Sequence, residues 1–314
     1  MSIKSFLKLV EIQTKVASVM PFILGTLYSV YRYKAFDLKN FILMFLSLLC
    51  FDMATTAINN YYDYKKATNI KGNDYKKKNI IGSDNLNLNT VRFIIVILVL
   101  IAIGAGIILT LNTDIVVLII GMISFLVGIF YTYGPIPLSR MPLGELFSGF
   151  FMGVVIIFLS IYIHIYDTGI IYLGYENNIV SMTVNIKEII YIFLISVPAF
   201  MGISNIMLAN NICDVEEDIV NKRFTLPYYI GKENAVKLFK WLYYIAYLDI
   251  ALIVALRVAP VVLILSILSF KQVKKNIDIF SKEQIKSKTF IMGVKNFIIM
   301  TLYQIVLVAI GILI

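Results

Sequence analysis

The chain has 314 residues, of which 60% are hydrophobic and 15% charged, and its mean hydropathy is +0.85. Soluble domains carry a smaller hydrophobic share, so the composition excludes a soluble protein and indicates a polytopic membrane protein. The net charge is +9, but the basic residues follow the membrane topology, and we therefore expect no nucleic-acid partner. The two cysteines, Cys50 and Cys213, are too few for a disulfide framework or a metal cluster.

Apolar stretches long enough to cross a bilayer recur along the whole sequence. A hydrocarbon core about 30 Å thick needs about 20 apolar residues in a helix. No separate soluble domain fits between the stretches, so we expect one transmembrane domain over residues 1–314. The pattern predicts an all-α bundle of about nine transmembrane helices, near residues 16–33, 39–58, 91–111, 114–133, 146–166, 188–209, 237–256, 258–270 and 291–314.

Residues 1–15 predict an amphipathic lead-in at the inner membrane surface, because apolar residues such as Phe6 and Leu7 alternate with Lys4 and Lys8. With the N-terminus inside, all but five of the 28 lysines and arginines fall on the inner side. This positive-inside asymmetry predicts a protein of the plasma membrane with its N-terminus and its polar motifs at the cytoplasmic face. The five exceptions are Arg32, Lys34, Lys39, Lys187 and Arg257.

The second apolar stretch ends in Asn59-Asn60-Tyr61-Tyr62-Asp63, which reads N-N-x-x-D. Helical spacing puts Asp52, Asn59 and Asp63 on one face. A carboxylate inside a membrane normally faces the bundle interior, a partner or water. For Asp52, a quiet ion pair and a place in the wall of a reaction chamber both fit, and we favour the second.

A polar stretch from Tyr64 to Thr90 follows, with Lys65, Lys66, Lys71 and Lys76 to Lys78. We expect a long loop there, which serves either as a functional lid or as a contact to anionic lipid. The fourth apolar stretch ends in Tyr131-Thr132-Tyr133-Gly134-Pro135-Ile136-Pro137, and these prolines and the glycine predict a non-helical inner loop before Arg140. The outer stretch 167–187 is weakly polar, and His164 beside it is expected at the interface, away from any reaction site.

The sixth apolar stretch ends in Asn210-Asn211-Ile212-Cys213-Asp214, which repeats the N-N-x-x-D phrase. Glu217 and Asp218 follow one turn later, beside Lys222 and Arg223. So many carboxylates repel one another unless a cation is present. An acidic helix start is the alternative, but it does not explain the repeated asparagines.

Two such faces meeting at a membrane boundary would form a ring of hard oxygen ligands, which suits Mg²⁺ with a bound diphosphate. We expect Asp63, Asp214 and Asp218 to be catalytic. The predicted metal ligands are Asp63, Asn60, Asp214, Glu217 and Asp218. The predicted substrate contacts are Asn59, Asn60, Asn210, Lys222, Arg223, Arg140, Tyr131 and Asp52. A membrane anchor remains the alternative for Arg140, and an interface aromatic for Tyr131.

The sequence resembles the UbiA-type intramembrane prenyltransferases over nearly its whole length. The resemblance is carried by Gln13 to Pro21 with Gly25, Asn59 to Asn69, Tyr131 to Pro137 with Gly144-Glu145, and Asn210 to Gly231. The second family motif, D-x-x-x-D, is present as Asp214 and Asp218. The first, N-D-x-x-D, is thinner: Asn60 stands where an aspartate is usual, and Ala67 and Asn69 stand where further acidic residues occur.

The resemblance implies helices around a lipid-open cavity, a Mg²⁺ cofactor, and transfer of a polyprenyl group from polyprenyl diphosphate to an aromatic acceptor. It is greatest for the branch that uses 1,4-dihydroxy-2-naphthoate in menaquinone biosynthesis. Another acceptor, of the 4-hydroxybenzoate, haem or glycerol phosphate type, stays open. A secondary transporter is the rival class, but it would place its polar residues at mid-membrane and not at one boundary. No obligatory protein partner is expected.

Overall fold

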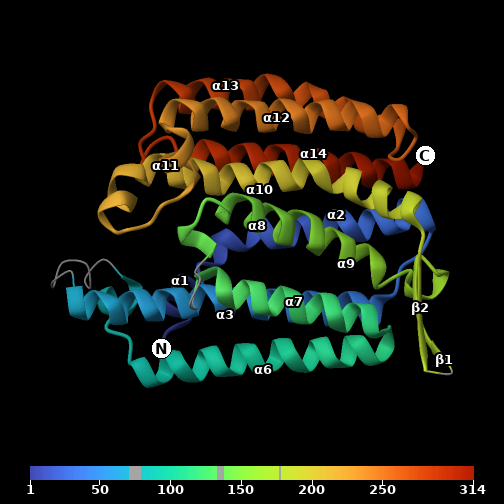
Figure 1. Ribbon diagram of the computed structural model, residues 1–314, viewed down its shortest axis with the longest axis horizontal. Helices are drawn as coiled ribbons and strands as arrows, with labels where there is room; N and C mark the ends of the chain where they lie inside the picture. Colours follow the sequence, from blue (N-terminus) through green and yellow to red (C-terminus); the bar gives the residue numbers. More distant parts are fainter. Residues whose placement is uncertain (71–78, 133–137, 177) are drawn as a thin grey trace.

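The computed structural model describes residues 1–70, 79–132, 138–176 and 178–314 (Figure 1). These residues are almost wholly helical, and many of the helices run side by side along the long axis of the molecule. The α-helices are α1 (Ile3–Leu9), α2 (Val16–Tyr33), α3 (Leu38–Ile70), α5 (Ile80–Ser83), α6 (Leu88–Asn112), α7 (Ile115–Thr132), α8 (Gly144–Gly149), α9 (Ile156–Tyr162), α10 (Ile186–Val220), α11 (Leu226–Ile230), α12 (Lys232–Ala255), α13 (Phe270–Lys282) and α14 (Ile291–Leu313). A π-helical turn (Phe150–Val155) joins α8 to α9, 3-10 segments lie at Ile12–Lys15, Leu138–Arg140, Tyr166–Thr168 and Val261–Ser269, and the strands are β1 (Ile171–Glu176) and β2 (Ile179–Val184).

Within the described residues, six helical stretches are long and apolar enough to cross a membrane, and the apolar stretch Ile115–Tyr131 is shorter. The six are Leu38–Lys65, Leu88–Asn112, Gly144–Tyr162, Ile186–Val220, Lys232–Ala255 and Ile291–Leu313. This confirms the predicted membrane protein, whereas the count of nine spans stays a prediction. The 35 residues of α10 extend about 52 Å at 1.5 Å per residue. This exceeds a hydrocarbon core of about 30 Å, so one end of α10 reaches beyond it.

Helices continue past the ends of three apolar stretches. The stretch after Asp63, where the sequence predicted a loop, stays helical up to Ile70, and α10 runs through the whole second motif to Val220. Residues 271–282, which follow the eighth apolar stretch, form most of α13. Polar residues such as Glu and Lys are good helix formers, so the end of the apolar pattern marks the membrane boundary and not the helix end. The predicted lid lysines Lys71 and Lys76 to Lys78, and the loop 133–137, lie outside the described residues.

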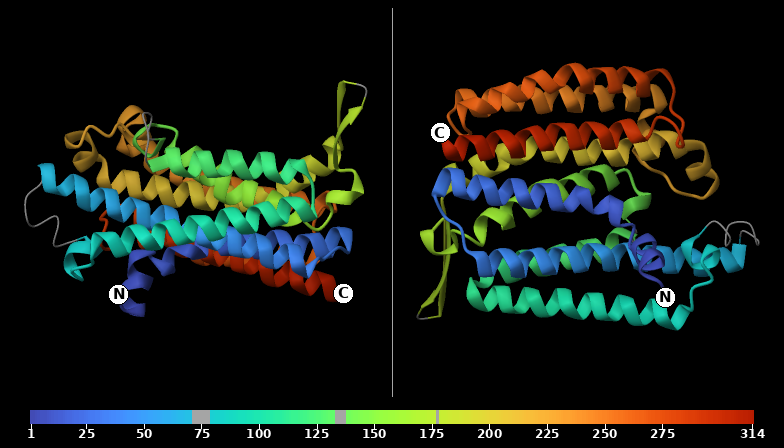
Figure 2. Two further views of the ribbon diagram at one scale, coloured as in Figure 1. Left: turned by 90° about the horizontal axis from the view of Figure 1, so that it is seen from below. Right: turned by 180° about the vertical axis from the view of Figure 1, so that it is seen from behind.

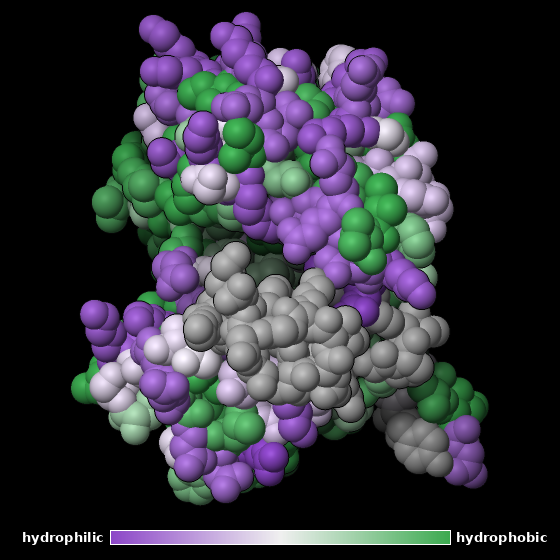
Figure 3. All heavy atoms as spheres, turned by 90° about the vertical axis from the view of Figure 1, so that its left-hand side faces the viewer, coloured by the Kyte–Doolittle hydropathy of each residue, from purple (hydrophilic) through white to green (hydrophobic). Residues whose placement is uncertain are grey.

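The predicted all-α fold is correct except at one place. The stretch 167–187 contains an antiparallel hairpin, in which β1 pairs with β2 from Ile171 opposite Val184 to Glu176 opposite Ile179. Figure 2 shows the hairpin projecting sideways at one end of the bundle. The C-terminal ends of α3 and α10 lie at the opposite end (Figure 1). That second end is the face seen in Figure 3, where hydrophilic side chains gather and the surface is hollowed between two halves.

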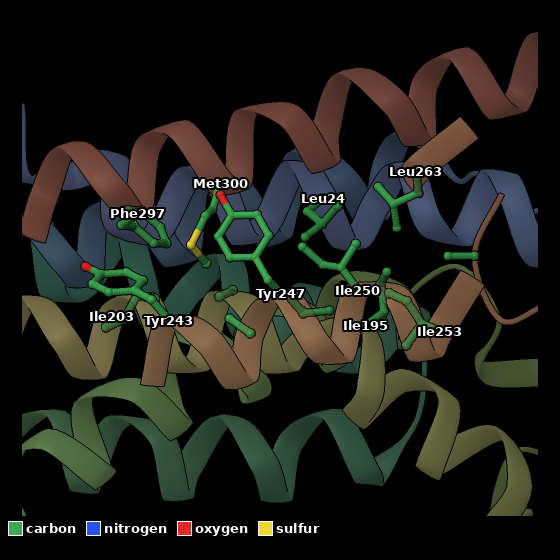
Figure 4. Packing of buried hydrophobic residues seen from close by; sticks show 14 of the residues in the cluster. Leu24, Ile195, Ile203, Tyr243, Tyr247, Ile250, Ile253, Leu263, Phe297 and Met300 are labelled. Atoms are coloured by element: carbon green, nitrogen blue, oxygen red, sulfur yellow. The ribbon is translucent and has the colours of Figure 1, made fainter. Parts of the chain in front are cut away.

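The largest core fills the space between α2, α9, α10, α12, α13 and α14 (Figure 4). Tyr243, Ile203 and Phe297 are among its buried side chains. Two glycines allow the backbones to approach closely, as small residues do in membrane bundles. A Cβ on Gly153 would lie 2.6 Å from backbone atoms of Phe200 in α10, and one on Gly25 would lie 2.8 Å from the carbonyl oxygen of Ile157.

Candidate active site

A cavity of about 670 Å³ lies between α3, α6, α7 and the α8–α9 rod. Its walls are mostly apolar. Along α3 the lining runs from Met44 to Asn59, which is about 22 Å of helix. Its polar lining includes Asp52, Asn59 and Tyr131, which lie toward the end of the bundle that carries the two motifs. The cavity therefore extends from a polar mouth deep into the apolar bundle, and three predicted substrate contacts lie in its wall.

Asp52 forms an ion pair and also lines the cavity. The sequence offered the ion pair and the place in the chamber wall as alternatives, and the structure shows both. Lys15 Nζ donates to Asp52 Oδ1 at 2.6 Å and to Thr56 Oγ1 at 2.6 Å. Ser18 Oγ donates to Asp52 Oδ2 at 2.5 Å. The Lys15 side chain is 4% exposed. Nothing in the local sequence pattern signals this pair, because Lys15 and Asp52 come from different helical segments.

The first motif is divided between two faces of α3. Asn59 lines the cavity, and Asp63 is exposed one turn further along. Asn60 faces the N-terminal lead-in, where its Nδ2 donates to the carbonyl oxygen of Leu9 at 3.0 Å and contacts Glu11 Oε1 at 3.4 Å. The structure therefore does not bring Asn60 to the face of Asn59 and Asp63. Its amide nitrogen anchors the lead-in, and the metal-ligand role of Asn60 stays a prediction.

In the second motif, a lysine occupies the place where a cation was expected. The Lys286 ammonium donates to Asn210 Oδ1 and to Asp214 Oδ2. It is presented by the turn between α13 and α14, which Thr289 closes by accepting from the Ile285 amide at 2.9 Å. The sequence showed Lys286 only as one basic residue of an inner stretch, so this contact was missed.

Asp218 is the most buried carboxylate of the second motif, at 4% exposed. Its Oδ1 lies 3.4 Å from Arg223 Nε. Its Oδ2 has no hydrogen-bond partner among the described residues. A buried carboxylate with an unpartnered oxygen is costly. An additional cation would relieve this cost, which supports the predicted place of Asp218 in a metal site.

The remaining predicted cations lie around Asp218. The turn after α10 packs on the 3-10 segment Leu138–Arg140: the Phe224 amide donates to the Arg140 carbonyl oxygen at 3.1 Å, and Arg223 Nη2 contacts the Ser139 carbonyl oxygen at 3.4 Å. The side chains of Arg140, Lys222 and Glu217 are exposed. The structure thus brings Arg140 and Arg223 to the same corner and leaves Glu217 on the surface.

A buried pair that the site prediction did not include joins this corner to the cavity. Asn211 Nδ2 donates to Glu145 Oε1 at 2.8 Å, and both side chains are buried. The Tyr131 hydroxyl, which lines the cavity, donates to the neighbouring Gly144 carbonyl oxygen at 3.3 Å. The two asparagines of the second motif therefore separate: Asn210 contacts Lys286, and Asn211 holds Glu145.

The side-chain oxygens of the second motif are suitable ligands for a magnesium ion. Among the described residues, no three His, Cys, Asp or Glu side chains already converge as a metal site. However, Asn210 and Asp214 jointly hold an ammonium group, and Asp218 retains an unpartnered oxygen nearby in sequence. Amide and carboxylate oxygens are the hard ligands that Mg²⁺ takes, usually with water and phosphate oxygens completing the set.

The chain belongs to the UbiA prenyltransferase family, whose sequence profile matches residues 18–294. It is therefore a prenyltransferase, and the transporter hypothesis is wrong. The 1,4-dihydroxy-2-naphthoate octaprenyltransferase of Bacillus subtilis (strain 168) is 30% identical over 239 residues, which cover 75% of this chain and 68% of that protein.

Two solved structures share the fold. A structure of digeranylgeranylglyceryl phosphate synthase is 17% identical, with a TM-score of 0.64 over 98% of each chain. A UbiA homologue from Archaeoglobus fulgidus bound to GPP and Mg²⁺ is 12% identical, with a TM-score of 0.62 over 99% of this chain and 100% of that one. At these identities the likeness confirms the UbiA-like fold expected from the sequence.

Proposed function

We propose that this protein transfers a polyprenyl group from a polyprenyl diphosphate to 1,4-dihydroxy-2-naphthoate, in menaquinone biosynthesis. The observation that carries the proposal is the cavity, whose lining joins Asp52, Asn59 and Tyr131 near the end with the two motifs to a long apolar interior. The relationship to the Bacillus subtilis octaprenyltransferase supports the choice of acceptor.

The apolar interior suits the prenyl tail. Burying a hydrocarbon chain among side chains such as Phe51, Phe125 and Leu118, which line the cavity, removes apolar surface from water. The cavity reaches about 22 Å along α3, so it accommodates several isoprene units in extended form. The diphosphate then lies at the polar mouth, since a multiply charged head cannot enter the apolar part.

The diphosphate head is held at the ends of α3 and α10. Asn59 and Asp63 on α3, and Asn210, Asp214 and Asp218 on α10, are the residues that would hold Mg²⁺. When bound, Mg²⁺ supplies positive charge that stabilises the leaving diphosphate. Lys286 contacts Asn210 and Asp214 in the structure; with these two residues holding the metal, its ammonium would be available to the diphosphate. Arg223, Arg140 and Lys222 add positive charge to the same corner.

The transfer itself breaks the bond between the first prenyl carbon and the diphosphate oxygen, and diphosphate leaves with the electron pair. An electron-rich ring carbon of the acceptor supplies the pair for the new carbon–carbon bond. The ring regains aromaticity by losing the group it carried at that carbon without its electron pair, as a proton or as carbon dioxide from a carboxylate. The aromatic face of Tyr131 at the cavity wall stabilises positive charge on the prenyl carbons, and the apolar walls keep water away.

We propose that the protein lies in the plasma membrane and that the polar end of the bundle faces the cytoplasm. The basic residues at that end support this orientation. Three further segments bring the six long stretches to about nine spans. They are α2, α7, and the continuous helical segment formed by Val261–Ser269 and α13. In this proposal the whole chain forms one domain, since the two motifs lie on α3 and α10, one from each half of the sequence.

The proposal is tested with membranes that contain the protein, a radiolabelled polyprenyl diphosphate and separate acceptors. Prenylated naphthoate that requires Mg²⁺ is the expected product. Product from 4-hydroxybenzoate, haem or a glycerol phosphate instead of naphthoate would leave the family assignment in place and refute the proposed acceptor.

A further inference from the structure

The β1–β2 hairpin has two chemically different faces. The register pairs Ile171 with Val184 and Leu173 with Met182. Paired residues share a face, and side chains alternate between faces along a strand, so Val180 belongs to the same face. These five residues of that face are all apolar. The opposite face carries the polar side chains Ser181 and Thr183, together with Tyr172, Gly174 and Ile179.

The apolar face is directed toward the bundle. At the base of the hairpin, Ile171 and Leu173 pack on the core cluster that contains Tyr162 and Val116. Beyond this base the same face has no cover within the described residues: Met182 is 63% exposed and Val180 is 72% exposed. The apolar face therefore extends beyond the bundle. Its exposed part, with Val180 and Met182, faces the same way as its packed part, with Ile171 and Leu173.

The hairpin runs across the direction of the spanning helices. Figures 1 and 2 show this in two views related by a quarter turn, at the end opposite the two motifs. A bilayer surface also lies across the helices that span it, so the hairpin runs along that surface. Apolar side chains at the same end of the bundle, Leu111 at 80% exposed and Ile115 at 48% exposed, belong to the lipid-facing surface of α6 and α7.

We propose that this hairpin is a membrane-surface anchor, whose apolar face, with Val180 and Met182, lies in the lipid boundary at the end opposite the active site. The apolar face is continuous with the lipid-facing surface of the spanning helices, and lipid is therefore its partner. The polar face, with Ser181 and Thr183, meets water. This is the arrangement of an amphipathic element in the plane of the interface, built here from two strands whose inner edges pair with each other.

The test uses single tryptophans and lipids whose acyl chains are brominated near the headgroup. Trp241 is the one tryptophan of the chain, so Trp241→Phe provides the background. Val180→Trp and Met182→Trp report on the apolar face. Ser181→Trp and Thr183→Trp are the matched controls on the other face, and Leu111→Trp on α6 calibrates full lipid contact. Each variant is reconstituted as the full chain in vesicles with or without the brominated lipid.

We expect the emission of Val180→Trp and Met182→Trp to fall about twofold in brominated vesicles, because interfacial elements bury their apolar face about 5–10 Å deep. The emission of Ser181→Trp and Thr183→Trp should change little. Two outcomes overturn the proposal. If none of the four is quenched while Leu111→Trp is, the face lies in water or under another protein chain. If all four are quenched equally, the hairpin is immersed and does not lie on the surface.

Discussion

At the scale of single residues, the site rests on carboxylates that need a cation. Asp214 and Asp218 lie four residues apart, and helical spacing alone was enough to predict that they share a face. The partners Lys286 and Glu145 could not be predicted. Lys286 is 72 residues from Asp214, and Glu145 is 66 residues from Asn211. Such contacts depend on how the helices pack and leave no periodic signal in the sequence.

Lys286 competes with the metal in this account. Lys286→Ala should lower the Mg²⁺ concentration at half-maximal activity by about two- to fivefold, because a half-exposed ion pair contributes at most about 1 kcal/mol. A Mg²⁺ titration of prenyl transfer measures the shift. The control is Lys288→Ala, two residues along the same turn, which should leave the titration unchanged. A higher Mg²⁺ requirement for Lys286→Ala would show that the ammonium assists metal binding.

The Lys15–Asp52 pair is expected to be structural as well as part of the cavity. Asp52→Asn leaves the buried Lys15 ammonium without its counter-charge, which should destabilise the protein by about 3 kcal/mol. Thermal unfolding of the purified protein in detergent measures the loss. The double variant Lys15→Met/Asp52→Asn should recover part of it. A single Asp52→Asn variant as stable as the parent would contradict the pairing.

At the scale of elements, the start of α2 at Val16 and the apolar helices were predictable from the sequence, whereas their polar extensions were not. Hydropathy falls at the membrane boundary, but the backbone hydrogen bonds of α3 and α10 continue past it. The hairpin was missed because its alternation in 171–184 was short and lay in a stretch of weak polarity. The π-helical turn at Phe150–Val155 approaches α10 closely because Gly153 has no side chain to meet the Phe200 backbone. This contact depends on helix packing and could not be predicted from the sequence.

Gly153→Ala should destabilise the bundle by about 1–3 kcal/mol, because the added Cβ overlaps the Phe200 backbone and forces a shift of packed helices. Gly104→Ala on α6 is the matched control, since a Cβ there meets nothing within 4 Å. It should be neutral or stabilise by about 0.5 kcal/mol through helix propensity. Thermal unfolding compares the two. Equal stability of both variants would refute the close packing at Gly153.

At the scale of the whole molecule, the bundle is organised so that one polar mouth opens into one apolar interior. The sequence placed both motifs at one boundary from the distribution of basic residues and apolar stretches. It could not outline the cavity, because the lining comes from α3, α6, α7 and α8–α9 and follows from their packing.

The cavity should set the length of the prenyl chain. Gly121 on α7 lines it, and a Cβ at this position meets nothing within 4 Å. Gly121→Phe should fill the space and lower the ratio of kcat/KM for a long over a short prenyl diphosphate by about tenfold. Competition between two labelled diphosphates measures the ratio. Gly104→Phe, outside the cavity lining, should keep the parent ratio; the same drop in both variants would mean that the tail lies elsewhere.

The central claim is that the carboxylates at the end of α10 support prenyl transfer. The most direct measurement compares Asp214→Asn with Asp278→Asn, an exposed carboxylate on α13, in a Mg²⁺-dependent assay of prenylated naphthoate. The account predicts that Asp214→Asn loses activity by about 100-fold or more, as expected when a group that stabilises transition-state charge is removed, and that Asp278→Asn keeps the parent rate. Full activity of Asp214→Asn at every Mg²⁺ concentration would contradict it.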